Sequence, residues 1–255
     1  MADLADFSGR TALVTGAASG IGAAVARWLD GRGIAELVLV DLDAAGMAAL
    51  DLSCQVRRYV GDVSDPALWE RIEAELPRLD HALVNAGIAN GGPLVDTDFA
   101  EWRRIMSVNL DGAFLAMRTA LRAMHKGAGK SMVVTASAVA LKPAPGSGPY
   151  AATKAAVAHL ARIAAAENLD RGIRVNAIAP GRVDTPIWTK TDSFKALEEQ
   201  LGSHEAALEA VGNDTGLFAA FTSAEMIAGQ IGFLLSDAAE NITGTVLASD
   251  GGYTL

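Results

Sequence analysis

Residues 11–22 read TALVTGAASGIG. The first five of them are β-branched or apolar and predict a short buried strand, while the spacing of apolar residues from Ile21 onward predicts a helix. Between the two lie glycines at positions 16, 20 and 22, which permit a tight turn. A strand, a glycine-rich turn and a helix in so short a span predict the start of a βαβ unit, and with it a parallel sheet.

The same alternation of short β-branched runs with longer alanine-rich stretches continues along the whole chain. It predicts an α/β fold of repeated βαβ units. The length of 255 residues fits one large domain or two small ones, but no repeat, low-complexity tract or linker marks a boundary, so one domain over residues 1–255 is the simpler interpretation. The expected strands are residues 11–15, 37–41, 56–60, 82–85, 132–135, 174–178 and 245–248, and the expected helices are residues 21–32, 66–76, 101–125, 150–170 and 224–235.

The rhythm breaks only at residues 186–223, a long segment before the last expected helix and strand. A long insertion in a compact domain is typical of a lid or binding loop, and the alternative is a plain surface excursion. Its large apolar side chains indicate either a substrate with apolar surface or residues that pack on the scaffold. These residues are Ile187, Trp188, Phe194, Leu197, Leu201, Leu217, Phe218 and Phe221.

Composition narrows the classes of function. Acidic residues outnumber basic ones by 30 to 21, for a net charge of -9, which would repel a phosphate backbone and argues against a nucleic-acid partner. No stretch reaches the roughly 18 apolar residues of a membrane span, and the acidic start is unlike a signal peptide, so we expect a soluble, cytoplasmic protein. One cysteine, Cys54, leaves no internal disulfide. We expect no metal, because the four histidines lack ligand spacing: His81, His125, His159 and His204.

The glycine-rich turn has the features of a dinucleotide site. Its glycines would let the backbone approach a pyrophosphate, and the free amides at the helix start would attract the negative charge. A lone motif is equally compatible with a turn that binds nothing, but Asp41 ends the next expected strand, 19 residues after Gly22. A carboxylate there can accept hydrogen bonds from the adenosine ribose and would repel a 2′-phosphate, and Ser19 and Leu42 stand where a cation for that phosphate would be needed. The sequence therefore favours NAD over NADP.

A second cluster lies at the start of the expected helix 150–170. Tyr150 and Lys154 are four residues apart, so their side chains leave the same helix face. Lowering the pKa of a phenol from about 10 to neutrality requires about 4 kcal/mol of preferential phenolate stabilisation, which an ammonium and a positive nicotinamide in a partly dry site can supply. This spacing arises often by chance. The hypothesis gains weight because Ser137 follows the preceding strand, at the sheet edge where α/β proteins bind ligands.

From Arg10 to Leu255 the chain resembles the short-chain dehydrogenase/reductase family. Its motifs occur in the family's order: a Thr-Gly-x-x-x-Gly-x-Gly loop from Thr15, Asp62-Val63, Asn85-Ala86-Gly87, Asn109, Ser137 placed 13 residues before Tyr150, Pro180-Gly181, and then Val183 and Thr185. The resemblance implies a single-domain Rossmann fold, a doubly wound seven-stranded parallel sheet with helices on both faces. It also implies an NAD-dependent oxidoreductase that interconverts a secondary alcohol and a ketone by hydride transfer.

The resemblance also implies a role for each residue of the site. Tyr150 would be the general acid or base, and Ser137 would hydrogen-bond and orient the substrate oxygen. Lys154 would depress the tyrosine pKa and bind the nicotinamide ribose, while Asn109 would anchor a water in a proton path. The implied cofactor-binding residues are Gly16, Ser19, Gly20, Ile21, Gly22, Asp41, Leu42, Asp62, Val63, Asn85, Ala86, Gly87, Tyr150, Lys154, Pro180, Gly181, Val183 and Thr185, and the expected substrate contacts are Ser137, Tyr150, Ile187 and Trp188.

Two other functions could use the same scaffold. One is a non-catalytic NAD-binding regulator, although such proteins usually lose at least one of the four catalytic positions and none is lost here. The other is an isomerase or dehydratase with the same tyrosine and lysine, whose members generally have longer carboxyl-terminal regions. The partners expected from the resemblance are a small-molecule alcohol or ketone and, since the family is commonly tetrameric, three further copies of the chain.

Overall fold

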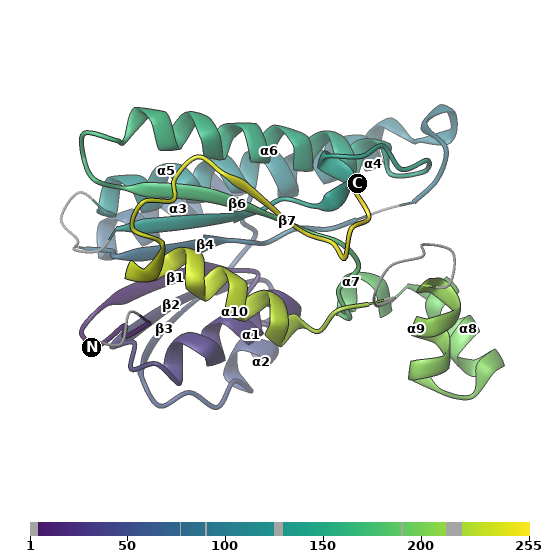
Figure 1. Cartoon of the computed structure of the whole chain (residues 1–255), viewed down its shortest axis with the longest axis horizontal. Helices are drawn as coiled ribbons and strands as arrows, with labels where there is room; N and C mark the ends of the chain where they lie inside the picture. The colour runs from purple at the N-terminus through teal and green to yellow at the C-terminus, as the bar shows by residue number, and fades with distance from the viewer. Residues whose placement is uncertain (1–4, 77, 90, 125–129, 190, 213–220) are drawn as a thin grey trace.

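The computed structural model describes residues 5–76, 78–89, 91–124, 130–189, 191–212 and 221–255. Within these residues, seven parallel strands form one sheet in the order β3-β2-β1-β4-β5-β6-β7 (Figure 1). All seven expected strands are present, each within two residues of the expected bounds, which confirms the predicted fold. The strands are β1 (Thr11–Thr15), β2 (Glu36–Asp41), β3 (Gln55–Val60), β4 (His81–Val84), β5 (Ser131–Thr135), β6 (Arg174–Pro180) and β7 (Val246–Ser249).

Helices cover both faces of the sheet (Figure 1). One face packs against α3 (Pro66–Glu75), α5 (Gly112–Met124) and α6 (Gly148–Glu167), and the other against α1 (Gly20–Asp30) and α10 (Ala224–Leu235). Strands buried on both sides need apolar residues at every position, and in β2 the four residues Leu37 to Val40 are fully buried. This requirement explains the uninterrupted apolar runs that made the strands recognisable in the sequence.

Some of the helices begin where a polar side chain caps them. Asp65 accepts a hydrogen bond from the Ala67 amide at the start of α3, with Pro66 in the first turn, and Ser223 accepts one from the Met226 amide at the start of α10. The α10 helix has the predicted bounds, and α1, α3 and α6 begin and end within three residues of theirs. The short α2 (Ala44–Ala48) and the 3₁₀ turns η1 (Leu94–Asp96), η3 (Ala138–Ala140) and η4 (Asp237–Ala239) were not predicted.

The expectation of one continuous helix at residues 101–125 is wrong, because the helix starts earlier and is divided in two. Asp98 caps an earlier start, where α4 (Phe99–Met106) begins, and a π-helical turn, η2 (Ser107–Asp111), separates α4 from α5. A π turn inserts about one residue without changing the apolar pattern much, so periodicity could not reveal it. His125, the predicted last residue, lies outside the described residues.

The segment at residues 186–223 contains helices that were not predicted. They are α7 (Pro186–Thr189), α8 (Asp192–Leu201) and α9 (His204–Gly212), and α8 and α9 project from the body (Figure 1). Thr191 caps α8 by accepting from the Phe194 amide, and Gly202 ends it at a φ of +77°. Leu217 and Phe218 lie outside the described residues.

The strand order reverses between β1 and β4, which is where open α/β sheets bind ligands. The chain segments that follow these two strands come very close together there. A Cβ added to Gly16, whose φ is +66°, would lie 2.9 Å from the Cα of Ala86. Only glycine fits at this position, so the first glycine of the motif fixes how the two halves of the sheet meet.

Candidate active site

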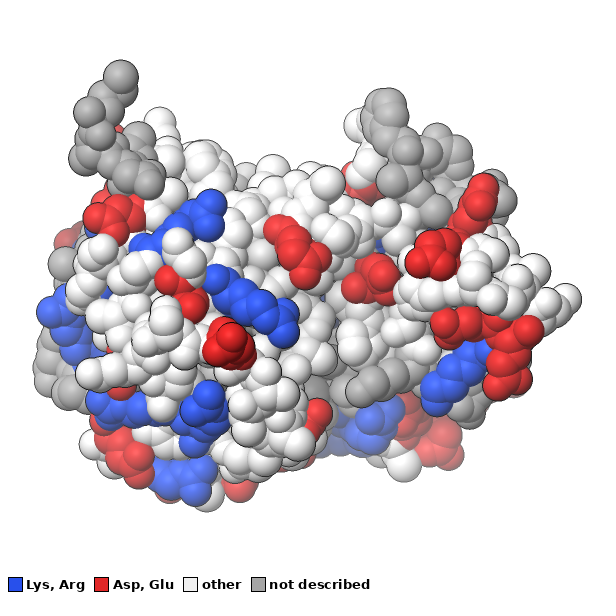
Figure 2. Space-filling model, turned by 90° about the horizontal axis from the view of Figure 1, so that it is seen from below, with Lys and Arg blue, Asp and Glu red and all other residues white. Residues whose placement is uncertain are grey.

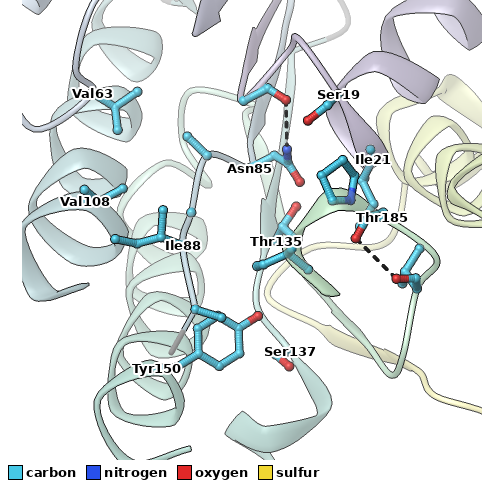
Figure 3. Close-up of a pocket in the computed structure, with 18 of the residues that line it drawn as sticks. Ser19, Ile21, Val63, Asn85, Ile88, Val108, Thr135, Ser137, Tyr150 and Thr185 are labelled. Atoms are coloured by element: carbon cyan, nitrogen blue, oxygen red, sulfur yellow. Dashed lines mark hydrogen bonds between the residues drawn. The ribbon is translucent and has the colours of Figure 1, made fainter. Parts of the chain in front are cut away.

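A cleft of about 470 Å³ opens at the carboxyl ends of the strands beside this reversal (Figure 3). Nearly all the residues singled out in the sequence line it; Gly22 and Asn109 do not. The lining residues are Gly16, Ser19, Gly20, Ile21, Asp41, Leu42, Gly61, Asp62, Val63, Asn85, Ala86, Gly87, Ile88, Ala89, Arg104, Val108, Thr135, Ala136, Ser137, Tyr150, Lys154, Pro180, Gly181, Val183, Thr185, Pro186, Ile187 and Trp188.

The glycine loop forms one end of the cleft floor. Gly20 has a φ of +51° and lies against Thr185, to which an added Cβ would approach within 3.0 Å. At Gly22 an added Cβ would lie 2.0 Å from the carbonyl oxygen of Gly16. Gly22 therefore stays out of the cleft and instead lets α1 pack tightly on the loop, which brings the amides of its first turn toward the cleft.

Asp41 lies at the end of β2, beside the glycine loop. One carboxylate oxygen accepts a hydrogen bond from the Ala18 amide at 2.9 Å, and the other accepts from the Asp43 amide at 3.0 Å. A carboxylate has about four acceptor sites, so each oxygen keeps capacity for a further donor. Leu42 beside it is largely exposed. The carboxylate is held in place with room to bind a pair of hydroxyl groups.

The ends of β3 and β4 supply the next part of the wall. Asp62 accepts from both the amide and the hydroxyl of Ser64 at 2.8 Å. The side-chain amide of Asn85 donates to the carbonyl of Thr15 at 3.2 Å, and the backbone amide of Asn85 donates to the Thr15 hydroxyl at 2.8 Å. Asn85 therefore joins β4 to β1 at the point where the strand order reverses.

The far wall follows β6. Gly181 lies so close to Asp250 that an added Cβ would be 3.0 Å from its Cα, and the Thr185 hydroxyl donates to the Val183 carbonyl at 3.2 Å. Val183 also forms a parallel bridge with Thr222. This bridge closes the base of the 186–223 segment next to the cleft.

Tyr150 and Lys154 leave the same face of α6 and reach the cleft. The Lys154 ammonium is buried, donates to the Thr135 carbonyl at 2.8 Å and lies 5.6 Å from the centre of the Tyr150 ring. Burial lowers the pKa of Lys154 to about 8. Burial also raises the pKa of Tyr150 above its ordinary value, while a hydrogen bond with Ser137 acts in the opposite direction. Burial is the larger of these two influences on the Tyr150 pKa.

Ser137 follows β5 and stands beside the phenol of Tyr150 (Figure 3). Its hydroxyl also accepts a long hydrogen bond, 3.4 Å, from the Val139 amide at the start of η3. Two hydroxyl groups from different elements therefore converge on one small volume, where both can contact a single substrate oxygen.

Asn109 lies behind the cleft wall, in the π-helical turn. Its side chain accepts from the Ile88 amide and donates to the Ile88 carbonyl, both at 2.8 Å, and donates to the Thr153 hydroxyl at 3.2 Å. An added Cβ at Gly87 would lie 3.3 Å from the Asn109 side-chain oxygen and 3.4 Å from the Lys154 nitrogen. Asn109 is thus a neighbour of the lysine and fixes the backbone after β4.

Several lining residues were not found from the sequence. Ile88, Arg104 and Val108 belong to segments that only the tertiary fold brings to the cleft, and no motif marks them. Thr135 could have been found, because it is the last residue of the strand that leads to Ser137.

The large apolar residues of the 186–223 segment divide between the two roles considered for them. Ile187 and Trp188 line the cleft, and Trp188 packs edge-to-face on Phe221 with ring centres 5.9 Å apart. Phe194 is buried and instead packs against His204, within the projecting helices. The segment therefore contributes side chains to the cleft wall and also has a small core of its own.

Two of the histidines, His81 and His204, have structural partners. His81 is fully buried, donates to or accepts from the Ser131 hydroxyl at 2.8 Å, and has a pKa lowered to about 3 by burial. No group of three or more potential metal ligands occurs among the described residues. Nor is any helix in the described part of the chain both long and apolar enough to cross a bilayer.

Comparison with known proteins assigns the fold and the site to a family. The family model described as "Enoyl-(Acyl carrier protein) reductase", of the short-chain alcohol dehydrogenase type, matches residues 16–254. The chain belongs to the short-chain dehydrogenase/reductase family. As a short-chain dehydrogenase/reductase it is a member of an oxidoreductase family, whose dehydrogenases typically use a nicotinamide cofactor.

Relatives of this short-chain dehydrogenase/reductase act on alcohols. The cis-4-hydroxycyclohexanecarboxylate dehydrogenase of Sinomonas cyclohexanicum is 39% identical, over 97% of this chain and 98% of that protein. The galactitol 2-dehydrogenase (L-tagatose-forming) of Cereibacter sphaeroides is 38% identical, over 98% and 96%. The crystal structure of levodione reductase superposes with a TM-score of 0.83 at 34% identity, over 97% and 98% of the two chains.

Proposed function

We propose that this chain is an NAD-dependent dehydrogenase that interconverts a secondary alcohol and a ketone, with Tyr150 as general acid and base. One observation carries the proposal: the Tyr150 phenol, the Ser137 hydroxyl and the Lys154 ammonium meet at one end of a cleft whose other end is a glycine loop and a carboxylate. A nicotinamide dinucleotide bound in this cleft supplies the hydride donor or acceptor.

The residues present fit that cofactor. The Gly16, Ala17 and Ala18 amides already donate to Val40 and Asp41, so a pyrophosphate would bind the amides of the first turn of α1, which packs closely on the loop at Gly22. Asp41 would accept hydrogen bonds from both ribose hydroxyls, because each of its oxygens retains acceptor capacity. A 2′-phosphate would meet this carboxylate and the uncharged side chain of Leu42, so NAD is favoured over NADP.

Tyr150 would exchange the proton with the substrate oxygen, and Ser137 would hold that oxygen in place by a hydrogen bond. Burial alone raises the phenol pKa, so the phenolate requires added positive charge from Lys154 and from the oxidised cofactor. Asn109 lies next to Gly87, as Lys154 does, and would anchor a water in the proton path that the family resemblance implies.

We further propose that the 186–223 segment is a lid over the substrate end of the cleft. Ile187 and Trp188 would contact the substrate, which favours a bulky apolar molecule. Figure 2 shows that acidic side chains predominate on the projecting helices, in contrast to the mixed charges on the body. A field of that sign disfavours anionic substrates, so an uncharged alicyclic or aryl-alkyl alcohol is the expected class. A homotetramer stays a prediction from the family resemblance, and a cytoplasmic location stays a prediction from the composition.

The test is a panel of neutral secondary alcohols with NAD, followed by absorbance of the reduced cofactor. Tyr150→Phe should abolish turnover. Tyr59→Phe is the matched control, because the Tyr59 hydroxyl bonds Glu75 outside the cleft and its loss should leave turnover intact. Full activity in Tyr150→Phe would refute the proton role, and conversion of a substrate without net redox change would favour an isomerase or dehydratase.

A further inference from the structure

Among the described residues, four buried side-chain polar atoms have no hydrogen-bond partner, and one of them belongs to a residue that lines the cleft. It is the hydroxyl oxygen of Thr135, and the residue as a whole is 7% exposed. A buried hydroxyl without a partner is unfavourable and uncommon in native proteins. The other three atoms, on Arg118, Thr119 and Gln230, belong to residues that do not line the cleft.

The backbone of Thr135 is fixed on both sides. The residue ends β5 in register with Ile178 of β6, and the next amide, of Ala136, donates to the Ile178 carbonyl at 2.8 Å. Its own carbonyl accepts the Lys154 ammonium at 2.8 Å. Because the main chain is held by the sheet and by the lysine, the hydroxyl cannot gain a partner by a small backbone movement.

Thr135 stands between the two walls of the cleft. Asn85 follows β4 on one side and Thr185 follows β6 on the other, and Tyr150 lies below (Figure 3). The adenosine half of a dinucleotide belongs at the opposite end, beside Asp41. The part of the ligand that passes Thr135 is therefore the half that reaches Lys154 and Ser137.

We propose that the Thr135 hydroxyl is a binding contact for the nicotinamide riboside half of the dinucleotide. A threonine hydroxyl both donates and accepts, so it can pair with a ribose hydroxyl or with the carboxamide of the nicotinamide. Thr135 then binds the cofactor through its side chain while its carbonyl holds the lysine that contacts the same ribose. This inference rests on the proposed function and adds a residue to it.

Binding rather than turnover tests the inference. Thr135→Val keeps the shape and removes the hydroxyl, and the dissociation constant of NADH is measured by fluorescence titration of the full-length protein without substrate. Loss of one neutral hydrogen bond predicts binding weaker by about 5- to 10-fold. Binding of ADP, which contains only the adenosine half, should stay unchanged, and Thr135→Ser should bind NADH within about twofold of wild type, since the hydroxyl is retained.

Thr119→Val is the matched control, because the Thr119 hydroxyl is equally without a partner and fully buried but lies on α5 away from the cleft. It should leave the NADH affinity unchanged. If Thr135→Val bound NADH as tightly as wild type, the inference would be overturned but the proposed function would stand. The same conclusion would follow if Thr135→Val weakened ADP binding as much as NADH binding, or if Thr119→Val weakened NADH binding equally. A wild-type protein that binds no NADH would overturn the proposed function itself.

Discussion

Lys154 holds a positive charge in a place that is unfavourable for one. The side chain is 5% exposed, its ammonium donates to a single described carbonyl, that of Thr135, and burial lowers its pKa to about 8. We expect Lys154→Met, which keeps the length and removes the charge, to stabilise the protein while it abolishes the proposed dehydrogenase activity. The prediction separates what the lysine does for folding from what it does for function.

The size of the effect follows from the pKa. A fall from 10.5 to about 8 corresponds to about 3 kcal/mol of unfavourable free energy in the folded state at neutral pH, at about 1.4 kcal/mol per pKa unit. The hydrogen bond to the Thr135 carbonyl is lost in the variant, which removes about 1 kcal/mol. The net gain is about 2 kcal/mol, or a rise in Tm of roughly 4–8 °C for a domain of this size.

The gain depends on pH in a defined direction. Below about pH 8, folded and unfolded chains both carry the proton on Lys154, and the variant has its full advantage. As pH rises from about 8 toward the unfolded pKa near 10.5, the folded wild type releases the proton and recovers stability. The advantage of Lys154→Met should therefore shrink over this range and vanish above it.

Urea unfolding of both proteins without nucleotide, at about pH 7 and about pH 10, measures the difference. Lys142→Met is the control, because Lys142 is exposed and bonds only the Tyr253 carbonyl among the described contacts, so its stability change should be small and independent of pH. A Lys154→Met protein that is less stable than wild type at neutral pH, or an advantage that persists at high pH, would refute the reasoning.

Three further outcomes are expected. Asp41→Ala should lower kcat/KM for NAD by about 10-fold or more and reduce the preference for NAD over NADP. A wild-type preference for NADP in the same assay would contradict the proposal that NAD is the cofactor. Gly22→Ala should destabilise the fold by about 3 kcal/mol, since its Cβ would lie 2.0 Å from a loop carbonyl; an unchanged urea midpoint would contradict the packing. Burial acts to lower the pKa of His204, but Asp184 and Glu198 raise it above the ordinary value. The contact of His204 with Glu198 of α8 therefore stabilises the projecting helices below the ordinary pKa, and this stabilisation is lost as pH rises through the raised pKa. Proteolysis of α8 and α9 should accelerate over that range in wild type but not in His204→Gln.

The fold was predictable because its inner strands are buried on both faces. These strands appear as apolar runs, as Leu37 to Val40 does, whereas the edge strand β3 is mostly exposed and contains Arg57 and Arg58; the turn chemistry between runs marks the bounds. The π-helical turn before α5 was not predictable, since one extra residue in a helix leaves its apolar period almost unchanged. The helix α8 was missed although Phe194, Leu197 and Leu201 have helical spacing, because we interpreted these residues only as contacts to a substrate or to the scaffold.

The candidate site was predictable where a motif carries it. Tyr150, Ser137 and Asp41 lie in the cleft at the positions that strand ends and helix spacing indicated. Two things could not be read from the sequence. The lysine's partner is a main-chain carbonyl, at Thr135, which no side-chain pattern encodes, and Ile88 reaches the wall only through the pairing of β4 with its neighbours.

The bridge between Val183 and Thr222 has an evolutionary consequence. The chain leaves the body and returns to it at one point, where the Asp184 amide donates to the Thr222 carbonyl at 2.9 Å and the Thr222 amide donates to the Arg182 carbonyl at 3.0 Å. Because the two ends of the 186–223 segment are hydrogen-bonded to each other, the segment can be exchanged between homologues without disturbing β6. Replacing this segment with that of another family member should therefore transfer substrate preference and leave the cofactor cleft and the proposed catalytic residues intact.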